Sequence, residues 1–241
     1  MQRPYMICTP PFCKSNGVRV LHLLYKQLEK RGMDVYLYCP VQNQPDYKYI
    51  EYDMQLDYLK EEGIVIYPEV VSGNPLNFKR VVRYVLYYPG KLGGDKEYDK
   101  GEMIFTHDRM FTLLGDVLTV PYVDTTLFYD DKRPKTQDCY FVYKGGKWRD
   151  APETRGLTEI NMSWPEKREE LAELLRSTGT LYSYDDCTSL LEEAALCGCK
   201  PKIITETGTR DYIPTYPHVL TDFEKQMDRF IEVTQKGVSN Q

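Results

Sequence analysis

The sequence predicts an α/β protein built from two successive domains, each a parallel sheet covered by helices. Short apolar runs of strand length alternate with longer stretches whose apolar residues recur at helical spacing. Strands that alternate with helices pair in parallel, and the helices pack on the faces of the sheet. The alternation lapses once, over the charged and proline-containing residues 125–135, and then resumes. We therefore expect two compact α/β domains joined near residue 127.

The first domain, residues 1–126, begins with a strand over residues 5–8 that ends at the turn signal Thr9-Pro10-Pro11. Apolar residues at helical spacing then predict a helix from Val18 to Lys30, and Gly32 closes it. Further strands are expected over residues 35–39, 103–106 and 122–124, and a helix over residues 110–118. Two more apolar runs are strands or buried helix segments: residues 64–67 and 82–87.

The second domain, residues 127–219, repeats the alternation. Strands are expected over residues 140–143, 157–161, 181–184 and 202–205, and helices over residues 166–175 and 188–196. A final amphipathic helix over residues 222–233 carries Phe223, Met227, Phe230 and Ile231 on one face. We expect this C-terminal region, residues 220–241, to pack back on the first domain.

Composition narrows the class of protein. Hydrophobic residues make up 41% of the 241 residues, enough for a sizeable core, and the formal net charge is −5. No dense run of Lys and Arg appears, so nucleic acid is an unfavoured partner, although a local basic groove would still allow it.

The seven cysteines are odd in number and show no paired CxxC spacing, which favours a reducing, cytoplasmic location. The apolar N-terminal stretch is too short for a signal peptide, and no stretch reaches membrane-spanning length.

The most informative segment is residues 180–204, which predicts a strand, a polar loop and a helix that Gly198 closes. Thr188 and Ser189 lie at the start of this helix. Unpaired backbone N–H groups and the positive end of the helix dipole make such a start a ready anion site, suited to a diphosphate. Simple N-capping by Asp186 or Thr188 explains the same residues without any ligand.

This segment resembles the donor-binding segment of retaining glycosyltransferases of the GT-B fold. Asp185 and Glu193 stand eight positions apart, where that family has two acidic residues. The resemblance implies that Asp185 approaches the transferred sugar, that Glu193 binds the ribose hydroxyls, and that the amides of Thr188 and Ser189 hold the donor diphosphate. Glu192 is the alternative second acid if the alignment shifts by one residue.

The segment also departs from the family pattern in two places. The first acid is an aspartate where glutamate is usual, so its carboxylate has a shorter reach. The usual Gly-Phe-Gly after it is replaced by Asp186-Cys187-Thr188, which leaves the sugar contacts of this turn open.

Three further segments of the chain match the family. His107 follows a predicted strand, where the family carries a histidine that faces the donor sugar; a solvated or capping histidine is the alternative. Gly17 enters the first helix, where a glycine lets the backbone approach the donor closely. Lys144 and Lys147 follow the first strand of the second domain, and the resemblance assigns them to the leaving diphosphate. A solvated basic turn explains these lysines equally well.

The resemblance implies two Rossmann-like domains that face each other across a cleft, in the GT-B architecture. The first domain, residues 1–126, would then be on the acceptor side, and the second, residues 127–219, would bind the nucleotide sugar. It implies transfer of a hexose or deoxyhexose from a nucleotide-diphosphate sugar to a hydroxyl of a glycan or other acceptor, in glycan or polysaccharide synthesis. His107 and Asp185 are the expected catalytic residues, and retention of anomeric configuration is expected. If the enzyme inverts instead, Asp108 or an acid near the first loop is the candidate base.

No metal and no further cofactor are expected, because the aspartate pairs lack the DxD context of metal-dependent sugar transferases. Other functions remain open at this point. A GT-B epimerase or phosphorylase, a nucleotide-sugar-binding subunit that needs a partner chain, and a sugar transferase that modifies nucleic-acid bases would share these motifs. The unusually frequent tyrosines, 21 in all, have half-buried sheet and helix surfaces as their ordinary explanation and sugar stacking as the alternative.

Overall fold

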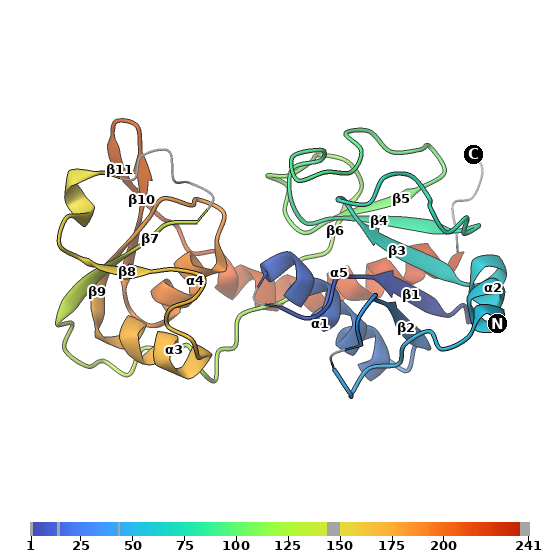
Figure 1. The fold of residues 1–241 in the computed structure, drawn as a ribbon, viewed down its shortest axis with the longest axis horizontal. Coiled ribbons are helices and arrows are strands. Elements are labelled where there is room, and N and C mark those ends of the chain that lie inside the picture. Colours follow the sequence, from blue (N-terminus) through green and yellow to red (C-terminus); the bar gives the residue numbers. More distant parts are fainter. Residues whose placement is uncertain (1, 14, 43, 144–149, 237–241) are drawn as a thin grey trace. The chain divides into compact units, whose positions relative to one another are not determined.

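The computed structural model describes the chain except for residues 1, 14, 43, 144–149 and 237–241. It confirms a mixed α/β chain with two mainly parallel sheets, of six and five strands (Figure 1). The chain forms two compact units. Unit 1 comprises Met1–Tyr122 and His218–Gln241, and unit 2 comprises Val123–Pro217.

The sheet of unit 1 is parallel throughout and has the strand order β2-β1-β3-β4-β5-β6. Its strands are β1 (Tyr5–Cys8), β2 (Val35–Tyr38), β3 (Ile64–Pro68), β4 (Val81–Val85), β5 (Met103–Thr106) and β6 (Asp116–Val117). The helices that accompany it are α1 (Asn16–Lys30), α2 (Asp53–Glu62) and the larger part of α5 (Tyr216–Lys236). The order reverses between β1 and β3, which makes this the topological switch point of the sheet.

Alternate residues of β1 face two different layers of core, as the two-residue period of a strand requires. Tyr5 and Ile7 belong to a cluster with apolar side chains of α1 and α5, and Met6 and Cys8 belong to another with Leu59 of α2. The C-terminal helix supplies Phe223, Met227 and Phe230 to the first cluster, each at most 4% exposed. Residues more than two hundred positions apart in sequence thus share one core.

The sheet of unit 2 has the strand order β11-β10-β9-β7-β8, and all pairs are parallel except β10 with β11. Its strands are β7 (Gln137–Phe141), β8 (Thr158–Ile160), β9 (Thr178–Ser183), β10 (Lys200–Thr205) and β11 (Gly208–Asp211). The accompanying helices are α3 (Arg168–Ser177), α4 (Ser189–Leu196) and the short 3₁₀ helix η2 (Pro152–Thr154). Here the strand order reverses between β7 and β9.

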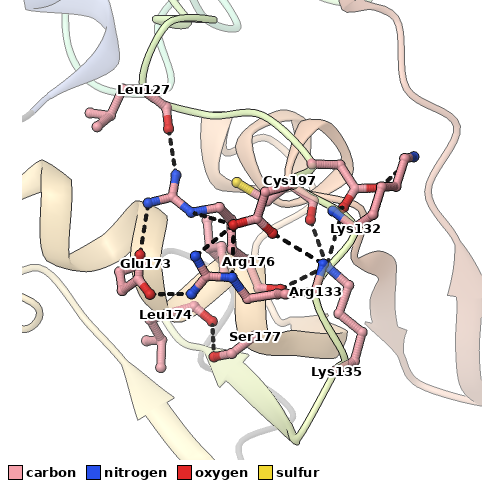
Figure 2. Close-up of polar contacts among 12 residues, drawn as sticks. Leu127, Lys132, Arg133, Lys135, Glu173, Leu174, Arg176, Ser177 and Cys197 are labelled. Carbon is pink, nitrogen blue, oxygen red and sulfur yellow. Dashed lines mark hydrogen bonds and ion pairs between the residues drawn. The ribbon is translucent and has the colours of Figure 1, made fainter.

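The charged stretch that separates the two predicted domains is bound to unit 2 by side-chain contacts (Figure 2). Lys135 donates to the carbonyls of Arg176 and Cys197, at 2.8 and 2.7 Å, which lie at the C-terminal ends of α3 and α4. A cation there satisfies unpaired carbonyls and complements both helix dipoles. Glu173 accepts from both Arg133 and Arg176, which ties the stretch to α3. The residues that interrupt the alternation of strands and helices are therefore held in place by ion pairs and hydrogen bonds.

Two elements predicted for the first domain are wrong. Residues 110–118 form turns followed by the short strand β6, because Gly115 has a φ of +70° and a Cβ there would lie 1.9 Å from the Ile104 carbonyl oxygen. Leu113 is 85% exposed, so the apolar spacing of this stretch does not produce a buried helix face. Residues 122–124 form no strand; instead Asp124 accepts from the amide and hydroxyl of Thr126 in a turn. The sequence reasoning also missed α2 and β11.

Candidate functional site

The switch point of the sheet in unit 2 places several predicted site residues together. In an open parallel sheet, ligands bind beyond the carboxyl ends of the strands where the strand order reverses. At the end of β9 the Tyr184 amide donates to the carbonyl of Phe141 at the end of β7, at 3.0 Å. The chain then runs through Asp185 to Thr188 and enters α4 at Ser189.

Asp185 lies in this loop with only 4% of its surface exposed. Its Oδ1 accepts from the Cys187 amide at 3.0 Å, and its own amide donates to the Ser183 hydroxyl. Its Oδ2 is buried and has no hydrogen-bond partner among the residues that the structure describes. Because an unpaired buried acceptor is unfavourable, this oxygen suits a hydrogen-bond donor on a ligand.

Thr188 is the N-cap of α4, and its hydroxyl accepts from the Leu190 amide at 3.3 Å. This is the capping role that the sequence offered as the alternative to a ligand contact. Ser189 is the first helical residue and is 7% exposed. Capping by a side chain leaves the helix dipole in place, so the start of α4 retains its attraction for an anion.

Glu193 is 1% exposed, and its carboxylate is paired with a residue that the sequence reasoning did not find. Arg168, the first residue of α3, donates to both carboxylate oxygens, at 2.7 and 3.2 Å. The Arg168 guanidinium also lies 4.5 Å from the centre of the Phe128 ring, a cation–π contact. A ribose hydroxyl at Glu193 would therefore share its carboxylate with Arg168.

Glu192, the alternative second acid, has a different set of contacts. Its Oε1 accepts from the Tyr212 hydroxyl, the Thr215 amide and the Thr215 hydroxyl, at 2.6, 2.6 and 2.7 Å. These bonds hold the segment after β11 against α4. Within the described part of the chain its Oε2 is buried without a partner. The three donors on one oxygen indicate a structural role for Glu192.

His107 belongs to unit 1 and follows β5, as expected. The Tyr84 hydroxyl donates to the Leu118 carbonyl at 2.5 Å, so it accepts from His107 Nδ1, which lies 3.1 Å away. This arrangement places the ring proton on Nδ1 and leaves Nε2 as an acceptor. Burial of the ring lowers the pKa of His107 to about 4, which keeps the imidazole neutral at ordinary pH.

The rings and backbone around His107 connect it to the start of α1. The Tyr122 ring centre lies 5.6 Å from that of His107, and the Tyr122 carbonyl accepts from Arg19 of α1 at 2.7 Å. Gly17 lies in the first turn of the same helix. A Cβ on Gly17 would come no closer than 3.7 Å to the Leu86 side chain, so this position tolerates a side chain. Among the described residues of unit 1, none packs so closely that a glycine is required there.

The predicted residues thus fall into two groups. Gly17 and His107 lie in unit 1, while the four other described residues lie in unit 2 on or before α4: Asp185, Thr188, Ser189 and Glu193. Lys144 and Lys147 lie outside the described residues. Across the described ranges, no cluster of three or more His, Cys, Asp or Glu side chains could hold a metal ion.

No protein-family model matches the chain, and a search of curated proteins found no match to it. Over the part of the chain that the structure describes, no helix is both long and apolar enough to cross a lipid bilayer. The seven cysteines are free thiols.

Proposed function

We propose that the protein is a glycosyltransferase that takes a sugar from a nucleotide-diphosphate donor bound by unit 2. The observation that carries the proposal is the buried Oδ2 of Asp185, which has no hydrogen-bond partner among the described residues and lies just before α4 at the switch point of the sheet. A donor of this class brings both chemistries that the location favours, an anionic diphosphate and a hydroxyl-rich sugar.

In the proposed reaction the first turn of α4 stabilises the departing diphosphate. Charge on the leaving oxygen increases in the transition state, and fixed N–H dipoles that point toward that charge lower the barrier. Asp185 accepts a hydrogen bond from a hydroxyl of the transferred sugar and fixes its orientation. Glu193, held by Arg168, accepts from a ribose hydroxyl. The acceptor hydroxyl replaces the diphosphate at the anomeric carbon, and a leaving diphosphate oxygen takes its proton in the retaining reaction that we favour.

We propose a reducing compartment such as the cytoplasm as the site of this activity. Buried thiols support it: Cys8, Cys139, Cys197 and Cys199 are each at most 8% exposed. Burial raises the pKa of Cys8 and of Cys199 to about 12, so these thiols are protonated and unreactive.

Binding of donors tests the proposal first. Thermal unfolding of the purified chain is followed with UDP, GDP, dTDP and CDP and with their common sugar conjugates. A ligand that binds the folded state raises Tm in proportion to the logarithm of its excess, so one nucleotide family should stand out. No shift with any of these ligands would count against the proposal.

Two variants test where the sugar donor binds, and two measurements separate a transferase from a subunit that only binds the donor. Asp185→Asn should lower affinity for the sugar conjugate more than for the free nucleotide diphosphate, because only the conjugate carries the sugar hydroxyl. Asp186→Asn, at the adjacent and exposed aspartate, is the matched control. Release of nucleotide diphosphate from the bound donor, with an identified sugar product, indicates transfer. Binding without release would instead support a nucleotide-sugar-binding subunit.

A further inference from the structure

A pocket in unit 1 lies apart from all the residues discussed so far. It is found at the carboxyl end of β2, the edge strand of the sheet, and has a volume of about 190 Å³. The described residues that line it are Leu37, Tyr38, Cys39, Tyr49, Ile50, Glu51, Tyr52, Asp53 and Leu56.

The backbone that forms the pocket is held in place by hydrogen bonds. The Leu37 amide donates to the Lys48 carbonyl at 2.8 Å, and the Ile50 amide donates back to the Leu37 carbonyl at 3.3 Å. Leu37 and Tyr49 thus form a parallel bridge, which adds residues 48–50 to the edge of the sheet. Helix α2 then starts at Asp53, so the pocket lies between the end of a strand and the start of a helix.

The side chains of the pocket combine aromatic faces with hydrogen-bond acceptors. Tyr38 is 40% exposed and Tyr52 is 69% exposed, so both rings are available to a ligand. Glu51 and Asp53 are exposed carboxylates on the same rim. An aromatic face attracts the slightly positive C–H groups of a saturated ring, and carboxylates accept from hydroxyl groups.

The charge of the lining excludes the donor from this pocket. Among the described lining residues two are acidic and none is basic. A nucleotide diphosphate would meet repulsion from both carboxylates, whereas a neutral, hydroxyl-rich ring would not. The volume is small compared with pockets for drug-sized ligands, which indicates a ligand of single-ring size.

We propose that this pocket binds one neutral pyranose unit, as the recognition site for a glycan acceptor. Tyr52 and Tyr38 contact the faces of the sugar ring, and Glu51 and Asp53 accept from its hydroxyls. The acceptor role rests on the glycosyltransferase proposal, whereas the binding of a pyranose does not.

Amide chemical shifts of the full-length protein test the binding. The probes are the methyl glycosides of glucose, galactose, mannose and N-acetylglucosamine, each titrated at millimolar concentrations. We expect saturable shifts for at least one glycoside, centred on residues 37–39 and 49–53. No shift for any glycoside, or shifts confined to other residues, would overturn the proposal. Stronger binding of spermidine at the same residues would also overturn it, because it would indicate a cation site.

Variants of two tyrosines, one that lines the pocket and one that does not, sharpen the test. Tyr52→Ala should weaken glycoside binding about tenfold through loss of the stacking face. Tyr58→Ala is the control, because Tyr58 lies on α2, is 54% exposed and is not among the lining residues. Both tyrosines are exposed, so neither change should unfold the chain. Equal glycoside affinity in the two variants would remove Tyr52 from the site.

Donor binding in the same variants separates this proposal from the first. Tyr52→Ala should leave the Tm shift with the donor unchanged while it lowers transfer to a glycan. Glycoside binding without any donor binding would leave the pocket assignment standing and remove the glycosyltransferase proposal. Donor turnover without glycoside binding would support the glycosyltransferase proposal and remove the pocket assignment.

Discussion

Each unit contains a glutamate with a buried side chain whose two carboxylate oxygens both accept from one arginine, and the two pairs differ in their access to solvent. In unit 1, Arg83 donates to both oxygens of Glu102 at 2.9 Å, and the side chains are 0% and 5% exposed. In unit 2, Arg168 pairs with Glu193, and the side chains are 34% and 1% exposed. Arg83 donates from Nε and one terminal nitrogen, and Arg168 donates from both terminal nitrogens. The larger difference lies in the surroundings of the two arginines.

The other contacts of each arginine explain the difference. Arg83 also donates to the carbonyls of Val71 and Gly73, and its guanidinium carbon lies 5.4 and 5.1 Å from the ring centres of Tyr67 and Tyr98. Its guanidinium therefore makes four hydrogen bonds and two ring contacts. Arg168 contacts the Phe128 ring, and a third of its side chain remains exposed.

The comparison shows how to separate a structural ion pair from one that is available to a ligand. An ion pair that is enclosed by the protein can exchange partners only when its surroundings open, because a buried charge without a partner is costly. A pair that is exposed on one side can admit a ligand hydroxyl beside the carboxylate. Four predictions test this distinction and the division of roles between the units.

The largest effect is expected for Glu102→Gln in the enclosed pair. The change leaves Arg83 charged and without its counterion in the interior, which should cost about 3–5 kcal/mol of unfolding free energy. Urea unfolding followed by circular dichroism measures the loss. Lys132→Ala is the control, because Lys132 is 84% exposed and its pair with Asp130 should contribute little. A free energy of unfolding close to that of the unmodified chain would show that other groups stabilise the charge of Arg83.

The resemblance places His107 at the donor sugar, and a positioned group that assists proton transfer there contributes at least about 100-fold to the rate. His107→Ala should therefore lower turnover about 100-fold, with little change in donor affinity. The reason is that the donor contacts we propose lie in unit 2, whereas His107 lies in unit 1. Steady-state kinetics and donor titration of the same preparation measure the two effects. Unaltered turnover would remove His107 from the active site. A loss of donor affinity as large as the loss of turnover would show that His107 binds the donor.

Glu193→Gln tests the exposed pair with the same substitution as Glu102→Gln. We expect a stability loss of about 1–2 kcal/mol, smaller than in unit 1 because solvent still reaches Arg168. Donor affinity should fall about tenfold, since a ribose hydroxyl loses its charged acceptor. Urea unfolding and calorimetric titration with the donor identified by Tm shift give the two values. Unchanged donor binding would contradict the ribose assignment.

Thr188→Ala should have the smallest effect, a loss of about 1 kcal/mol from removal of the α4 N-cap. Thr188→Ser keeps the capping oxygen and should restore most of that stability. Donor affinity should remain almost constant in both variants, because the backbone amides of the helix start are retained. A large loss of affinity in the alanine variant alone would show that the hydroxyl itself binds the donor.

Local patterns in the sequence were sufficient to predict much of the secondary structure. The strands at residues 5–8 and 103–106 and the helix that ends at Lys30 were predicted within two residues of their observed bounds. Gly198 closes α4 with a φ of +79°, a conformation that glycine adopts without strain. These features depend on a few neighbouring residues, and so periodicity and turn chemistry could predict them.

Only the tertiary structure decided the partners of the candidate site residues. Glu193 meets Arg168 across 25 positions, and His107 meets Tyr84 across 23, and neither pairing leaves a spacing signal in the sequence. The same holds for residues 110–118, where the close approach of Gly115 to the Ile104 backbone prevents the helix that apolar spacing favoured. The amino-acid sequence by itself determined where strands and helices could form, because those preferences are local. The fold decided which charges are enclosed and which remain open, because burial depends on residues brought together from distant parts of the chain.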